Sequence, residues 1–254
     1  IHLYSNVEKV VAEDGRFSYL VMADGSKEEG DACIIATGGV SYQTTGSTGD
    51  GYRFAEAMGH KITEPAPSLV PMNVREEYIP ALMGLSLRNV QATVYDGKKE
   101  LYSDFGEMLF THFGVSGPLI ISASAYVGKI LQKKHELKLV IDLKPALSEE
   151  QLDARVLREF DANHNKQFKN AVTGLFPAKL LPVMIHLSGI DPEKKVNEIS
   201  REERKAFGSL IKELPMTVTG TRSFAEAIIT QGGISVKDIN PSTMESKRVR
   251  HLYF

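Results

Sequence analysis

A short stretch of the chain, IIATGGVSYQTTGSTGDGYRFAEAMGHKI at 34–62, contains two clusters of glycine. The first cluster, Ala36, Thr37, Gly38 and Gly39, ends an apolar segment that we expect to be a buried strand. Paired glycines at the carboxyl end of such a strand let a ligand approach the backbone, because no Cβ stands in the way. In open α/β sheets this is the end at which ligands bind.

The second cluster, Thr48, Gly49, Asp50 and Gly51, begins a predicted helix from about Asp50 to Met58. Free N–H groups at a helix start suit an anionic or strongly polar ligand. The alternative is that Thr48 or Asp50 is simply an N-cap and the glycines are turns. Two clusters so close together favour a ligand site. The motif G-x-x-x-x-G-K-[ST] is absent, which excludes a phosphate-binding loop for nucleoside triphosphates. The motif G-x-G-x-x-G is also absent, so this sequence contains no primary dinucleotide-binding fingerprint.

Three further residues are candidates for the same site. Gly232 and Gly233 follow an apolar strand-like run, and their alternative interpretation is a bulge or a turn. His112, in THFG at 111–114, could donate a proton during reduction of a double bond, because imidazole groups titrate near neutral pH. The alternative for His112 is a structural histidine in a Phe-rich stretch. The other histidines show no spacing typical of a metal site.

The composition limits the classes of function. The formal net charge of −2 argues against nucleic acid as a partner, and the short basic runs, such as Lys133 with Lys134, are expected to be solvated. The single cysteine, Cys33, excludes an intrachain disulfide and favours the reducing cytoplasm. No apolar run is long enough to span a membrane. We therefore expect a cytoplasmic protein with a small-molecule substrate.

The elements that position these residues form an α+β or α/β arrangement. The first 36 residues predict strands joined by Asp-Gly turns at 14–15 and 24–25, and EPAPSLVP at 64–71 predicts a boundary. Residues 66–145 are β-rich and barrel-like, with a helix from about Pro118. Residues 146–214 are helical and open with Ser148 and Gln151 at capping-box spacing. A return strand occupies 215–226, and the last segment resembles the first. The body at 66–226 is therefore expected to be an insert within a domain formed by 1–65 and 227–254.

Four stretches carry a family resemblance. They are ATGGVSYQTTGSTGDGYRFAEAMGHKI (36–62), PAPSLVPMNV (65–74), EMLFTHFGVSGPLIISAS (107–124) and QGGISVKDINPSTMESKRVRHLYF (231–254). In this order they resemble the HI0933-like family of bacterial flavoproteins, also called BaiN/YhiN-type NAD(P)/FAD-dependent oxidoreductases. The resemblance implies an FAD domain with two dinucleotide-binding halves, of which 1–65 and 227–254 are a remnant, and an inserted substrate or cap domain.

The resemblance also assigns the site residues. Residues 36–39 and 48–51 are implied to line FAD, Gly232 and Gly233 to lie near its reacting face, and NAD(P)H to be the electron donor. The family's N-terminal G-x-G-x-x-G unit and its C-terminal flavin-pocket segment are missing from the sequence. The chain is therefore expected to be a fragment that binds FAD weakly or not at all and is inactive by itself.

Two classes of function follow. The first is a flavin-dependent oxidoreductase that passes hydride from NAD(P)H through FAD to an unsaturated or carbonyl-containing organic substrate. The second is a protein-binding insert on a flavin scaffold or redox sensor, without turnover of a small molecule. An apolar cavity facing the glycines would favour the first, and an exposed apolar patch on the insert would favour the second.

Overall fold

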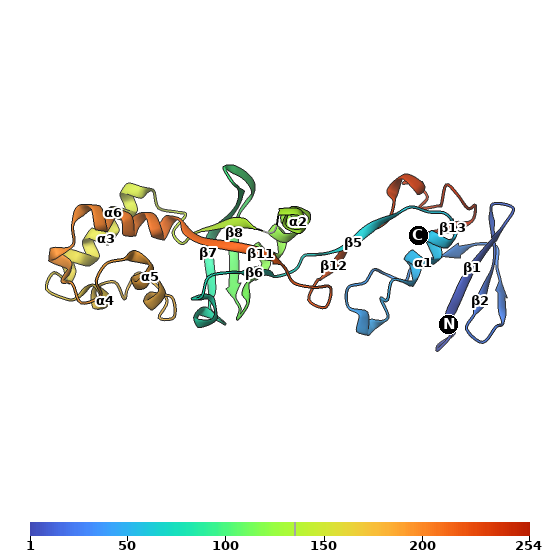
Figure 1. Cartoon of the computed structure of the whole chain (residues 1–254), viewed down its shortest axis with the longest axis horizontal. Helices are drawn as coiled ribbons and strands as arrows, with labels where there is room; N and C mark the ends of the chain where they lie inside the picture. The colour runs from blue at the N-terminus through green and yellow to red at the C-terminus, as the bar shows by residue number, and fades with distance from the viewer. Residues whose placement is uncertain (135) are drawn as a thin grey trace. The chain divides into compact units, whose positions relative to one another are not determined.

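The structure is a computed structural model that describes residues 1–134 and 136–254. It has a mixed α+β fold that contains a closed barrel, which confirms the α+β class and the barrel-like character of the β-rich part. The chain divides into two compact units. One consists of residues 1–68 and 223–254, and the other of residues 69–222. Figure 1 labels many of the elements of both units.

The first unit contains three small sheets and one α-helix among its described residues. Strands β1 (Val7–Glu13), β2 (Arg16–Met22) and β3 (Lys27–Glu29) form an antiparallel meander. Its first turn has Asp14 and Gly15 at positive φ, as the Asp-Gly pair predicts. Strand β4 (Cys33–Ile34) pairs in parallel with β13 (Leu252–Tyr253), and β5 (Ile62–Ser68) pairs with β12 (Ile229–Ile234). Helix α1 spans Asp50–Ala57.

One expectation about this unit is wrong. The strand before the first glycine cluster has only two residues and is not buried, since Ile34 is 73% exposed. The proline-rich segment, predicted to be a boundary, contains the division between the two units, which falls between Ser68 and Leu69, and its residues 64–68 are extended in β5. Pro65 and Pro67 are tolerated in β5 because this strand pairs with β12 alone. No second strand on the other side of β5 needs hydrogen bonds from the N–H groups that proline lacks.

The second unit is built around the barrel, whose six strands follow the order β10, β11, β6, β9, β8, β7. Their bounds are β6 (Met72–Val74), β7 (Ser86–Asp96), β8 (Lys99–Phe110), β9 (Gly114–Ser116), β10 (Leu137–Asp142) and β11 (Leu214–Thr221). Pairing of β7 with β10 closes the barrel. Helix α2 (Pro118–Lys134) packs against β8 and β11. It begins at the predicted Pro118.

Four helices follow β10, and Figure 1 shows them grouped together at one end of the barrel unit. They are α3 (Glu149–Ala162), α4 (Phe168–Ala171), α5 (Leu181–Ser188) and α6 (Arg201–Lys212). The predicted capping box of α3 is confirmed: the Ser148 hydroxyl accepts from the Gln151 N–H, and the Gln151 side chain accepts from the Ser148 N–H. Ser200 and Glu203 cap α6 in the same way.

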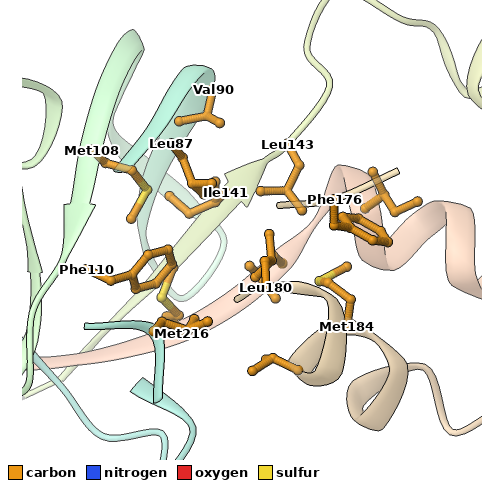
Figure 2. Close-up of a cluster of buried hydrophobic side chains, with 14 of the residues drawn as sticks. Leu87, Val90, Met108, Phe110, Ile141, Leu143, Phe176, Leu180, Met184 and Met216 are labelled. Atoms are coloured by element: carbon orange, nitrogen blue, oxygen red, sulfur yellow. The ribbon is translucent and has the colours of Figure 1, made fainter. Parts of the chain in front are cut away.

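One continuous hydrophobic core joins the barrel to these helices. Figure 2 shows side chains from the barrel strands meeting side chains from the helical part, among them Leu87, Met108, Phe110, Ile141, Phe176, Leu180 and Met184. Each of these is less than a tenth exposed. Because interiors are close-packed, the two parts support each other's geometry. None of the described helices has the length and apolar character needed to cross a lipid bilayer.

Candidate functional site

The two glycine clusters of the first unit are held together by one side chain. The Thr37 hydroxyl accepts a hydrogen bond from the Gly51 N–H at 3.1 Å, so the segment after β4 is fixed to the first turn of α1. A Cβ on Gly51 would lie 2.4 Å from Thr37 Oγ1, well inside contact distance. Glycine at 51 is therefore required by the packing of the protein on itself. Gly38 has φ +73° beside Ser47, another position that favours glycine.

Thr230, on β12, fixes the end of the first cluster. Its hydroxyl oxygen accepts from the N–H groups of Val40 (2.9 Å) and Ser41 (3.1 Å), and it lies 3.0 Å from the Ser41 hydroxyl. A Cβ on Gly39 would come within 2.5 Å of Thr230 Oγ1. The structure thus places Gly39 against β12, close to the second predicted glycine pair. Sequence reasoning missed Thr230, because nothing near it in the sequence indicates a partner 190 residues away.

Tyr52 occupies the space between Gly39 and Gly233. A Cβ on Gly233 would lie 2.7 Å from Tyr52 Cε1, and a Cβ on Gly39 would lie 3.1 Å from the phenol oxygen. Gly233 also has φ +95°, a conformation that other residues rarely adopt. Burial raises the pKa of the Tyr52 phenol further above neutral pH, where a phenol is already protonated. At neutral pH its hydroxyl can donate a hydrogen bond and does not act as a base.

Gly232 has a different role from Gly233. The register between β12 and β5 shifts between Gln231 and Gly233, and Gly232 sits in this irregularity with φ +100°. A Cβ there would be 2.5 Å from the Glu64 carbonyl oxygen. These contacts fit the bulge alternative, in which glycine allows two backbones to approach closely.

The start of α1 differs from the simple capping alternative. The N-cap is Gly49, with φ +88° and no side-chain cap, so neither Thr48 nor Asp50 fills that position. The Thr48 hydroxyl instead donates to Asp50 Oδ2 at 2.7 Å, and Arg53 lies 3.1 Å from Asp50 Oδ1. The Thr48 hydrogen bond, followed by the Arg53 contact, lowers the pKa of the Asp50 carboxyl. The helix start therefore carries its own anion, which already interacts favourably with the helix dipole.

Two hollows of the first unit lie along the glycine segment. One, of about 550 Å³, has mostly hydroxyl-bearing walls: Ser41, Tyr42, Thr45, Ser47, Tyr52 and Thr230 line it together with Gly39. The other, of about 720 Å³, is more apolar, and Thr37, Thr48 and Asp50 contribute to it with Ile34, Ile35 and Phe54. Both volumes fall in the range of small-molecule sites, about 300–1,000 Å³. The hydroxyl-lined hollow can offer many hydrogen bonds to a polar ligand.

His112 lies in the other unit, whereas the remaining predicted site residues all lie in the first. It is exposed on a tight turn and contacts Phe113 edge-on, with ring centroids 5.0 Å apart. The guanidinium of Arg222 lies 4.2 Å from the centroid of the same Phe113 ring. The catalytic role of His112 stays a prediction.

A second histidine, His60, forms a buried polar cluster that sequence reasoning missed. It is 3% exposed, and its ring bonds to the Ala55 carbonyl (3.0 Å) and the Ser246 hydroxyl (2.7 Å). Ser246 Oγ also accepts from the N–H groups of Arg248 and Val249. Nδ1 must donate to the carbonyl, so Nε2 accepts from the hydroxyl in the neutral ring. All these groups have partners, so the cluster fits a structural role.

The segment TMESK at 243–247 lies next to this cluster. Glu245 and Lys247 both bond to the backbone: Glu245 accepts from the His251 N–H, and Lys247 donates to the Lys237 carbonyl. Throughout residues 1–134 and 136–254, no three His, Cys, Asp or Glu side chains are grouped as a metal site requires.

Comparison with known proteins gives a family match for the larger unit. The model of the "HI0933-like protein barrel and H2TH domain" matches residues 66–229. A 3-dehydro-bile acid delta(4,6)-reductase of Clostridium scindens is 26% identical over 253 residues, covering 100% of this chain and 62% of the relative. A ribosomal RNA dihydrouridine synthase of Haemophilus influenzae is 31% identical over 252 residues, covering 98% of this chain and 59% of the relative.

A third relative carries the same name as the second. The ribosomal RNA dihydrouridine synthase of Escherichia coli is 26% identical over 221 residues, covering 87% of this chain and 52% of that protein. The chain therefore spans between about half and three fifths of the length of these curated relatives.

Proposed function

This chain belongs to the HI0933-like family, and from that membership we propose that the protein is a flavin-dependent oxidoreductase that reduces a carbon–carbon double bond conjugated to a carbonyl group. One observation carries the proposal: the names of the relatives describe the same chemistry on different molecules. A 3-dehydro-delta(4,6) bile acid has double bonds conjugated to a ketone. A dihydrouridine synthase saturates the uracil double bond next to a ring carbonyl.

The cofactor in this proposal is FAD, which when bound and reduced by NAD(P)H supplies the hydride. The residues present fit its polar portion. The hydroxyl-lined hollow offers Ser41, Ser47 and Tyr52 as hydrogen-bonding groups within a volume of about 550 Å³, while Thr230 holds the Val40 and Ser41 backbone in place. Glycines 38, 46 and 49 have positive φ along the same segment, and a Cβ on Gly46 would meet nothing within 4 Å, so the backbone there is open.

The chain's own residues have three roles in the proposal. Residues 36–39 and 48–51 hold the polar part of the cofactor, mainly through backbone groups. Tyr52, whose phenol is neutral at pH 7, can donate a hydrogen bond to a ligand in the same hollow. His112 is the candidate for protonating the carbon next to the carbonyl, because it is an exposed imidazole in the barrel unit.

The domain assignment is part of the same proposal. Residues 1–65 and 227–254 are a remnant of the two-dinucleotide-binding-domain FAD domain, and residues 66–226 are an inserted domain that contributes to the substrate cavity. A cytoplasmic location completes it, supported by the single cysteine.

The protein-binding alternative receives less support. It calls for a contiguous apolar patch on the insert. The exposed large apolar side chains described for the barrel unit, Met83, Phe105, Tyr126 and Leu157, come from four different parts of the chain: the turn after residues 79–82, β8, α2 and α3. No one of these elements presents a broad apolar face to a partner.

The test uses the full-length protein. We expect a flavin absorption band after purification or after reconstitution with FAD, and bleaching of that band on anaerobic titration with NADH or NADPH. Reoxidation of the reduced protein by a conjugated enone, with a saturated ketone as the matched control, would support the proposed reaction. A full-length protein that takes up no FAD would contradict the proposal.

A further inference from the structure

Helix α2 presents an exposed stripe that the proposed function does not use. Ile120, Ala123, Val127 and Leu131 are buried against the barrel. On the opposite side of the helix lie Tyr126, Lys129 and Lys133, spaced three and four residues apart and all exposed. Tyr126 is 66% exposed.

The Tyr126 ring is held in place from one side. It packs against Tyr102 of β8, with ring centroids 5.2 Å apart and planes inclined by 41°. The Tyr102 hydroxyl in turn donates to Asp104 at 3.2 Å. Because Tyr102 orients it from behind, Tyr126 offers a free aromatic surface at little cost in side-chain entropy.

More lysines adjoin this stripe. Lys134 forms an ion pair with Asp96 at the β7–β8 turn, which brings that turn and its exposed Lys98 and Lys99 to the end of α2. Lys138 of β10 lies opposite Tyr95, the neighbour of Asp96. We call the set Lys98, Lys99, Lys129, Lys133, Lys134 and Lys138, with Tyr126, the α2 lysine face.

The α2 lysine face is locally basic although the chain as a whole is not. Four carboxylates lie nearby: Asp96 is bound to Lys134, Glu136 is bound to Arg75, Asp104 accepts from Tyr102, and Glu100 is on β8. The other five lysines of the face make no ion pair with any residue in the described parts of the chain. Such a face attracts a polyanion through local charge, which the net charge of −2 conceals.

We propose that the α2 lysine face binds a single-stranded stretch of RNA, with the lysines on its phosphates and Tyr126 stacked on a base. A single-stranded nucleic acid binds through cations on its phosphates and through aromatic rings on which its bases stack. An acidic protein would pair with the lysines but would make no use of the Tyr126 ring. The inference rests on the proposed function in that it makes a base in RNA the conjugated substrate. The binding itself needs neither flavin nor turnover.

The test is fluorescence anisotropy with a labelled, unstructured oligoribonucleotide and the full-length protein, titrated between 50 and 200 mM salt, a range over which phosphate contacts weaken markedly. The paired variant Lys129→Ala/Lys133→Ala should bind at least about tenfold more weakly, and its log–log salt slope should fall by about 1.4, since each contact to a single strand contributes about 0.7. Tyr126→Ala should lose about 5- to 150-fold in affinity, the equivalent of one stacked base, and Tyr126→Phe should retain it.

Lys195→Ala/Lys205→Ala is the matched control, because it removes two exposed lysines from the helical part instead. Equal weakening by this control, unchanged binding by the α2 variants, or capture of an acidic peptide in place of RNA would each overturn the inference. The two proposals fail separately. RNA binding without flavin reduction would remove only the proposed function, and reduction of a free enone without RNA binding would remove only this inference.

Discussion

The ring of Tyr52 lies so close to the backbone of Gly233 that a Cβ at position 233 would be 2.7 Å from Tyr52 Cε1. These residues are far apart in sequence, one in the first turn of α1 and the other in β12. Their contact gives a reason for glycine at 233 that needs no ligand. The same holds at Gly39 and Gly51, where Thr230 and Thr37 fill the space that a Cβ would take.

Gly233→Ala should destabilise the protein by about 2–4 kcal/mol. Part of the cost is the strain of a positive φ, and the rest is the clash with Tyr52. Gly46→Ala is a matched control, because Gly46 has a similar φ of +99° but nothing within 4 Å of the added Cβ. It should cost only about 1–2 kcal/mol. Urea unfolding of both variants measures the difference, and equal losses would mean that Tyr52 simply moves aside.

Thr230→Val should loosen the first glycine cluster. Valine keeps the shape of threonine but removes the oxygen that accepts from the Val40 and Ser41 N–H groups. We expect a loss of about 1–3 kcal/mol, because these donors are left without their partner. Thr230→Ser keeps the oxygen and should retain most of the stability. Hydrogen exchange at the two amides is the direct measurement, and unchanged protection in Thr230→Val would contradict the anchoring role.

Ser246→Ala should destabilise the cluster around His60. The substitution removes the hydroxyl that bonds to the buried His60 ring and accepts from the Arg248 and Val249 N–H groups. The expected loss is about 1–3 kcal/mol. Ser242→Ala, at an exposed position in the same segment, should have almost no effect. If the two variants unfold at the same urea concentration, the cluster contributes nothing measurable.

The ion pair between Asp153 and Arg204 predicts a pH dependence. Arg204 Nε and Nη2 donate to the two carboxylate oxygens at 2.8 and 3.0 Å, and this hydrogen bonding lowers the pKa of Asp153. A lowered folded-state pKa gives stability that is present above the unfolded value, about 3.9, and is lost as the pH falls through the folded value.

Asp153→Asn should therefore be less stable than the wild type by about 0.5–1 kcal/mol at pH 7, a small value because the pair is partly exposed. The gap should close as the pH falls below about 3.9. Unfolding measured between pH 2 and pH 7 checks this, with Glu149→Gln, an exposed carboxylate in the same helix, as the control. A gap that persists at pH 2 would show that the pair stabilises by some means other than charge.

Features set by neighbouring residues could be predicted from the sequence. The start of α1 at Asp50, the turn at Asp14 and Gly15, and the capping box at Ser148 each depend on a few adjacent residues. Local conformational preference and short hydrogen bonds decide them, so the sequence contains the necessary information within one window.

The contacts that shape the candidate site could not be predicted in this way. Thr230 meets Val40 across 190 residues, and His60 meets Ser246 across 186. Such pairs depend on how β12 and the final segment return to the first unit. The prediction of a buried strand at 33–36 was also wrong. The apolar residues of this segment predict burial, but β4 has only two residues and its Ile34 is exposed.

The unbroken core shared by the barrel and its helices limits how this fold can be recombined. A chimera that exchanged the barrel alone, keeping the helices from a distant homologue, would have to re-match side chains such as Phe110, Leu180 and Met184 across the junction shown in Figure 2. Substitutions on one side of that junction must therefore be accompanied by substitutions on the other. Evolution and protein engineering alike are expected to transfer residues 69–222 as a single piece.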